Sequence, residues 1–139
     1  MNRKSYPCLD FVNSGSPRAP ELRDALFEIF AAEARGRRAP RRALRALDEK
    51  LSASYRQPQL ERKVVRYELT WESNARMGEI VRSTVELLTS DHLGRLRLCA
   101  ADDCNWVFLD YSKNGSRRWC DMNVCGNRAK ARRYYARWS

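Results

Sequence analysis

The fold of this chain is decided by two short stretches near its end, Cys99-Ala-Ala-Asp-Asp-Cys104 and Cys120-Asp-Met-Asn-Val-Cys125. Each cysteine pair encloses four residues, and fifteen residues separate the two pairs. Paired short spacings around an insert of this length are typical of a structural zinc site. Each pair presents two thiolates from one turn, and the insert lets the chain fold back to complete a tetrahedron with Zn–S distances of about 2.3 Å. The sequence therefore predicts a closed Zn²⁺ site whose ligands are Cys99, Cys104, Cys120 and Cys125.

The fifth cysteine, Cys8, stands apart from this group. An odd number of cysteines without an export signal argues against a disulfide framework, so we interpret Cys8 as a bystander thiol, a small apolar residue beside Leu9. Segment 1–10 has no apolar run, and no stretch of the chain approaches 18 uninterrupted apolar residues. The sequence thus predicts neither a secretory signal nor a membrane span, and we expect a cytoplasmic protein with no membrane partner.

The charge balance favours a polyanionic partner. The chain has 27 Lys and Arg against 17 Asp and Glu, a formal net charge of +10. From Tyr111 onward there are eight basic residues and one acidic residue, Asp121. This end stays positive even after the −2 charge of a four-thiolate zinc site is subtracted. The surplus predicts contacts with nucleic-acid phosphates.

The residues before the cysteines indicate an α+β protein, mainly α, with a helical body over 1–94 and a treble-clef-like zinc finger over 95–139. Apolar spacing predicts helices and strands in the body. The expected elements are an extended opening over Tyr6–Val12, a helix from Glu21 to about Arg35, a helix after Pro40, a strand or short hairpin within 59–71, and a helix from Ser73 or Asn74 to about Ser90.

Within the finger, residues 106–111 are predicted to form a strand, and Asn114-Gly115 is the signal of a hairpin turn. Residues 126–138 are predicted to be helical. On that helix Ala131, Tyr134 and Trp138 share one face, and Lys130, Arg133 and Arg137 lie on another. The aromatic stripe suits either core packing, which is the commoner use, or stacking on bases. The basic stripe is the functional candidate.

A family resemblance rests on these same residues. The cysteine pairs, Trp106-Val-Phe-Leu-Asp110 and Cys125-Gly-Asn-Arg-Ala-Lys130 resemble the CGNR zinc finger, over nearly all of 99–134. Upstream, Leu9-Asp-Phe-Val-Asn13 resembles the opening of the ABATE domain, which usually precedes this finger in bacterial proteins proposed to be stress-induced transcription regulators. The segment between Asn13 and Glu21 is shorter than is general in that family.

The resemblance implies DNA binding by the finger, with the four cysteines as metal ligands and Gly126, Asn127 and Arg128 as the signature. The expected nucleic-acid contacts are Arg117, Arg118, Asn127, Arg128, Lys130, Arg133 and Arg137. RNA or an acidic protein partner are the alternatives, and a homodimer is compatible with the sequence. An enzyme is not expected, because four protein ligands leave no open coordination position and His92 is the only histidine.

Overall fold

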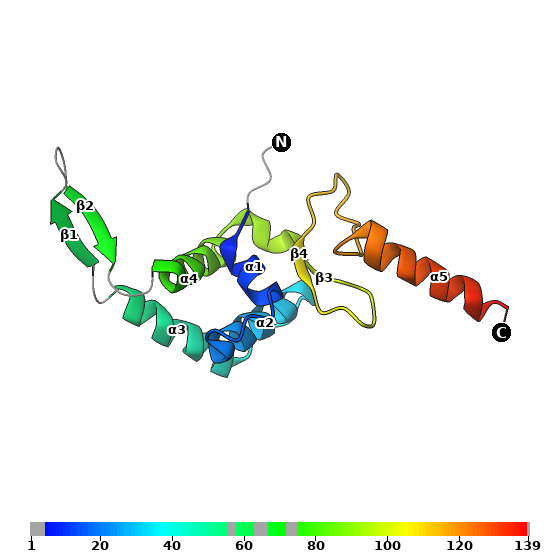
Figure 1. Ribbon diagram of the computed structural model, residues 1–139, viewed down its shortest axis with the longest axis horizontal. Helices are drawn as coiled ribbons and strands as arrows, with labels where there is room; N and C mark the ends of the chain where they lie inside the picture. Colours follow the sequence, from blue (N-terminus) through cyan, green and yellow to red (C-terminus); the bar gives the residue numbers. More distant parts are fainter. Residues whose placement is uncertain (1–4, 56–57, 63–66, 72–74, 139) are drawn as a thin grey trace.

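The computed structural model describes residues 5–55, 58–62, 67–71 and 75–138, with side chains described for 5–54 and 76–138. Three longer helices and one short helix form the body, a β-hairpin lies at one end of the molecule, and the last helix projects from the other end (Figure 1). The elements of the body are α1 (Pro7–Asn13), α2 (Pro20–Ala34), α3 (Arg41–Tyr55), β1 (Pro58–Arg62), β2 (Tyr67–Trp71) and α4 (Ala75–Leu88). The turn η1 (Asp91–Arg95) connects the body to the finger, which contains β3 (Leu96–Leu98), β4 (Val107–Leu109), the π-helical turn η2 (Met122–Gly126) and α5 (Asn127–Ala136).

The predicted fold class is confirmed: the chain is mainly helical, with small antiparallel sheets and a C-terminal cysteine cluster. The strand or hairpin expected within 59–71 is the β1–β2 hairpin, in which Leu60 pairs with Leu69. No helix in the described part of the chain combines the length and hydrophobicity that crossing a bilayer requires.

Helix α2 is the centre of the body. Pro20 occupies its first turn, where a missing N–H costs nothing, and the expected apolar face is completely buried. The buried residues include Leu22, Leu26, Ile29 and Phe30, which recur at helical spacing. Helix α2 contacts α1, α3 and both strands of the finger, so it connects the body to the cysteine-rich end.

The N-terminal segment is helical, so the extended opening predicted for Tyr6–Val12 is wrong. Pro7 supplies a φ that is already suited to a first helical turn, and Cys8, Phe11 and Val12 then fall on one buried face of α1. The Cys8 side chain is fully buried, its main-chain N–H donates to Ser83 Oγ of α4 at 3.2 Å, and burial raises the pKa of the thiol. Cys8 therefore acts as a small apolar residue, as interpreted from the sequence, and lies in the core.

The finger contains an antiparallel hairpin, but it does not turn at Asn114-Gly115 as predicted. Strand β4 forms within the expected 106–111 segment and pairs with the preceding β3, Leu98 opposite Val107. The chain does turn at Gly115, which has φ +61° and donates its N–H to Ser112. The segment after this turn does not pair with β4. The Asp110 carboxylate instead accepts two N–H groups at 2.8 Å each, from Ser112 before the turn and from Arg117 after it.

Strand β4 belongs to two hydrophobic clusters at once. Val107 and Leu109 point to one side and join the main core of the body. Phe108 points to the other side and packs with Cys99, Ala101 and Cys125 in a second, smaller cluster. Successive side chains of a strand face opposite ways, so three residues are enough to place the cysteine site directly against the body.

Candidate metal centre

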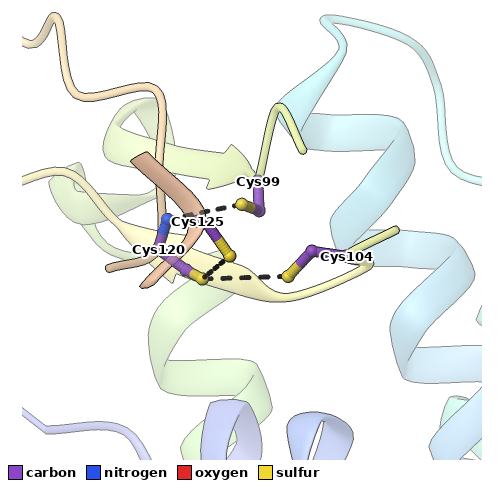
Figure 2. A group of neighbouring side chains, drawn as sticks. All are labelled: Cys99, Cys104, Cys120 and Cys125. Atoms are coloured by element: carbon purple, nitrogen blue, oxygen red, sulfur yellow. Dashed lines mark hydrogen bonds between the residues drawn. The ribbon is translucent and has the colours of Figure 1, made fainter. Parts of the chain in front are cut away.

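The four cysteines of the two pairs converge at one point of the finger (Figure 2). All four Sγ atoms lie within 4.8 Å of one another, with Cys104 and Cys120 at 3.8 Å and Cys120 and Cys125 at 3.6 Å. A tetrahedral ion with Zn–S distances of about 2.3 Å requires S···S separations of about 3.8 Å. The cysteines are free thiols, and their sulfur spacing fits one tetrahedral metal ion.

Local hydrogen bonds hold each pair in a turn. Cys99 follows β3 and donates its N–H to Trp106 O at 2.9 Å, while Cys104 donates to Ala101 O at 3.0 Å. In the second pair, Asp121 Oδ1 accepts the N–H groups of Asn123 at 2.7 Å and Val124 at 3.1 Å, which starts η2 and delivers Cys125. Hydrogen bonds within each pair thus form the turns, while those of Cys99 to Trp106 O and of Ala100 to Arg118 O join the first pair to the rest of the finger.

The electrostatics of the cluster favour a cation. Burial raises the pKa of Cys120, and the neighbouring thiols Cys125, Cys99 and Cys104 raise it further, because adjacent thiolates repel one another. N–H donors partly offset this charge: Cys120 N–H donates to Cys99 Sγ at 3.5 Å, and Arg128 Nη2 donates to Cys125 Sγ at 3.2 Å. Four soft sulfur ligands without an open position fit a structural zinc ion.

The three signature residues after Cys125 serve the architecture of this site. A Cβ on Gly126 would lie 2.5 Å from Met122 Sδ and 3.2 Å from Trp119 Cδ1, so glycine permits the close approach. Asn127 Nδ2 donates to Asn123 O at 3.1 Å, across η2. Arg128 contacts Cys125 and also pairs with Asp103 at 3.2 Å, so it links the two halves of the site.

The seven expected nucleic-acid residues are all exposed, but they divide into two groups. We call the two cysteine turns, 99–104 and 119–126, the metal knuckle. Asn127 and Arg128 contact it, and so does Arg117. The Arg117 guanidinium donates to Trp119 O and Cys120 O and lies 5.0 Å from the ring centroid of Phe108. The other four guanidinium and ammonium groups have no carboxylate partner among the described residues. They are Arg118, Lys130, Arg133 and Arg137.

The aromatic stripe of α5 is exposed, so the prediction that it packs in the core is wrong. No residue of α5 is buried; Tyr134 is 62% exposed, and Trp138, just beyond the helix, is 78% exposed. The helix projects past the body, and no described element lies beside its outer half (Figure 1). Apolar spacing along a helix predicts a face, but only a second element can cover that face.

Three acidic residues and one asparagine make contacts in the finger that were not predicted from the sequence. Asp102 and Asp103, inside the first cysteine pair, hold Arg132 of α5 at 3.6 and 2.9 Å. Burial pushes the pKa of Asp103 upward, but its own backbone hydrogen bond and the charges of Arg128 and Arg132 keep it below the usual value. The opposite charges of the first pair and the helix are visible in the sequence and indicate such contacts. Asp110 and Asn13 belong to the motif segments that carry the family resemblance, but the sequence does not show their contacts. The Asp110 carboxylate accepts from Ser112 and Arg117, and the Asn13 amide bonds with the main chain of Val107.

Comparison with known protein families agrees with this architecture. The model of the CGNR zinc finger matches residues 95–138. The model of the ABATE family, described as "Putative stress-induced transcription regulator", matches residues 16–91, more than half of the chain. The segment Leu9–Asn13 precedes the matched residues. No curated protein matches the chain. The earlier resemblance to both families is confirmed: the chain belongs to the ABATE family and ends in a CGNR zinc finger.

Proposed function

We propose that the chain is a DNA-binding transcription regulator of the cytoplasm, in which a structural Zn²⁺ holds the finger and α5 docks on DNA. The observation that carries the proposal is the exposed stripe of Lys130, Arg133 and Arg137 on α5, a helix with no buried residue that begins two residues after Cys125. In this scheme the body over 1–94 supports the finger over 95–139.

The metal has a structural role in this proposal. Cys99, Cys104, Cys120 and Cys125 would hold Zn²⁺, which supplies the cross-link between the β3–β4 hairpin and the start of α5. With four protein ligands there is no coordination position for a substrate, which supports a regulator and not a zinc enzyme. Arg128 would support the site by donating to the Cys125 thiolate.

The dimensions and chemistry of α5 suit the major groove. A helix with its side chains is about 10–12 Å across, and the major groove is about 12 Å wide. Arginine can contact a phosphate or the guanine edge through two parallel hydrogen bonds. Because Arg117 and Arg128 are engaged by the knuckle, the proposal assigns DNA contact to Lys130, Arg133 and Arg137, with Arg118 nearby.

The test compares two variants with equal loss of charge. The first variant replaces Lys130, Arg133 and Arg137 with Gln. The control variant replaces three exposed arginines around the end of α2 with Gln: Arg35, Arg37 and Arg38. Binding of the zinc-loaded proteins to random duplex DNA is measured over a salt series. We expect the slope of log K against log salt to fall by about 2.7 in the first variant, from about 0.9 for each lost contact, and to stay unchanged in the control. Equal slopes in the two variants would reject docking through α5.

A second candidate function, binding of single-stranded RNA, follows from the exposed aromatic side chains near the end of α5. Tyr134 and Trp138 lie beside the basic stripe, and their rings are 6.3 Å apart. Exposed rings of this kind stack on unpaired bases, at about 1–3 kcal/mol per base. Stronger binding to single-stranded RNA than to duplex DNA, lost in Trp138→Ala, would favour this reading. Binding to neither nucleic acid would favour an acidic protein partner.

A further inference from the structure

A groove of about 220 Å³ lies on the side of α5 that faces the metal knuckle. One wall is the loop of Ala100–Asp102 with Arg118 and Trp119; the other is the first half of α5. Four of the residues that line it are arginines: Arg118, Arg128, Arg132 and Arg133. Lys130 and Arg137 do not line this groove, so the finger presents basic groups to two different surfaces.

The four arginines are not equivalent. Asp103 pairs with Arg128 at 3.2 Å and with Arg132 at 2.9 Å, and Asp102 lies 3.6 Å from Arg132. These contacts fix two guanidinium groups in the wall. Arg118 instead lies 5.3 Å from the ring centroid of Trp119, and Arg133 makes one long contact, 3.4 Å to Ala129 O. Among the residues that the structure describes, neither Arg118 nor Arg133 has a carboxylate partner.

The size and the walls of the groove restrict what it can hold. Sites for small organic ligands usually have volumes of about 300–1,000 Å³, so this groove is small for a complete ligand of that kind. It is large enough for a single tetrahedral anion. Ala100, Ala129 and Trp119 supply apolar wall between the charges. Such walls lower the local dielectric and strengthen the attraction of an anion to the guanidinium groups.

We propose that this groove binds one phosphate of a nucleic-acid backbone, through the guanidinium groups of Arg118 and Arg133. The inference rests on the proposed function and adds a fixed phosphate contact on the flank of α5. Two guanidinium groups from different segments can each donate two parallel hydrogen bonds to one phosphate. A phosphate held there positions the duplex relative to Lys130 and Arg137 without reading the DNA sequence.

The first arm of the test needs no DNA. The zinc-loaded full chain is titrated with inorganic phosphate, and the Nε–Hε signals of its arginines are followed by NMR. We expect saturable shifts for Arg118 and Arg133, none for Arg137, and loss of the Arg133 shift in Arg118→Gln. No saturable shift, or equal shifts for all three arginines, would overturn the assignment of the groove as a phosphate site, whether or not the protein binds DNA.

The second arm asks whether the phosphate belongs to DNA. In Arg118→Gln we expect the salt slope for random duplex DNA to fall by about 0.9, as for the loss of one phosphate contact. Arg118→Lys keeps the charge and should restore the slope, and Arg38→Gln is the control for charge alone. Zinc content checks that each variant is folded. Phosphate binding with an unchanged slope in Arg118→Gln would reject a nucleic-acid ligand, while absence of DNA binding by the unmodified chain would reject the proposed function itself.

Discussion

The side chain of Asn13 makes two hydrogen bonds with the main chain of Val107: Asn13 Nδ2 donates to Val107 O at 2.8 Å, and Val107 N–H donates to Asn13 Oδ1 at 3.0 Å. Trp106 and Asp110, the residues that flank β4, form hydrogen bonds with the two residues that flank β3: Cys99 N–H donates to Trp106 O, and Asp110 N–H donates to Arg95 O. The main-chain groups of Val107 therefore point to the opposite edge, where the amide of Asn13 substitutes for another strand. The end of α1 is thereby joined to the strand that carries both clusters.

Replacing Asn13 with Ala should destabilise the protein by about 1–3 kcal/mol, the cost of leaving buried main-chain groups without partners. Val107 is 1% exposed, so water does not reach it readily in the folded protein. The measurement is the urea midpoint of the zinc-loaded chain. Asn105→Ala, an exposed asparagine two residues from Val107, is the matched control and should change the midpoint little. Equal midpoints for the two variants would mean that the Asn13 contact contributes no stability.

Asp110 should make stability depend on acid pH. Burial pushes the pKa of this carboxyl upward, but hydrogen bonds from Ser112 and Arg117 and the charge of Arg97 hold it below its usual value. A carboxyl whose folded-state pKa is depressed contributes stability above its unfolded-state pKa, and loses that contribution as pH falls through the folded-state pKa. We expect Asp110→Asn to cost about 1.5–3 kcal/mol at neutral pH, because the amide keeps one accepting oxygen and loses one of the two hydrogen bonds to a charged group. The difference from the unmodified chain should stay constant above about pH 5 and shrink below about pH 4. A difference independent of pH would contradict this role.

Removal of the metal should loosen only part of the finger. The second cluster consists of the cysteines with Ala101, Phe108 and Trp119, whereas Leu96, Val107 and Leu109 pack in the main core. After chelation we expect hydrogen exchange to accelerate over 120–136, because a structural zinc ion supplies the folding free energy of its site. Amides of α2 and of β3–β4 should keep their protection. Elemental analysis before chelation should give one zinc per chain. Loss of protection in all of these elements together would show that the body also depends on the metal.

Arg128 should contribute to metal retention. Its guanidinium donates to Cys125 Sγ and pairs with Asp103, so its removal leaves the thiolate with one donor fewer. Loss of a group that supports a metal ligand typically costs 10–100-fold in metal affinity, and we expect about tenfold for Arg128→Gln in competition with a chromogenic chelator. Lys130→Gln removes the same charge two residues away and should leave zinc affinity unchanged. A similar loss in both variants would indicate a general effect of charge.

The sequence was most informative where a local rule applies. The equal spacing of the two cysteine pairs predicted the cluster that the structure forms, because the residues inside each pair make the turn themselves. The helical periodicity of α2 predicted its buried face for the same reason. The prediction for the N-terminal segment was wrong because a seven-residue helix has too few turns to show a helical period in the sequence. The helix depends on burial of Cys8, Phe11 and Val12 against α2 and α4.

By itself, then, the sequence predicted the cysteine cluster, most of the helical body, the basic helix after it and the family, since each depends on residue types at fixed short spacings. Only the tertiary structure decided which side chains among the predicted nucleic-acid contacts already bind other residues of the finger. It engaged Arg117 and Arg128 in the knuckle, left Tyr134 and Trp138 exposed, and brought Arg118 and Arg133 into the lining of one groove. The physical reason is that exposure and pairing of a side chain depend on which distant segments pack beside it, and β4 between its two clusters sets that packing for the whole finger.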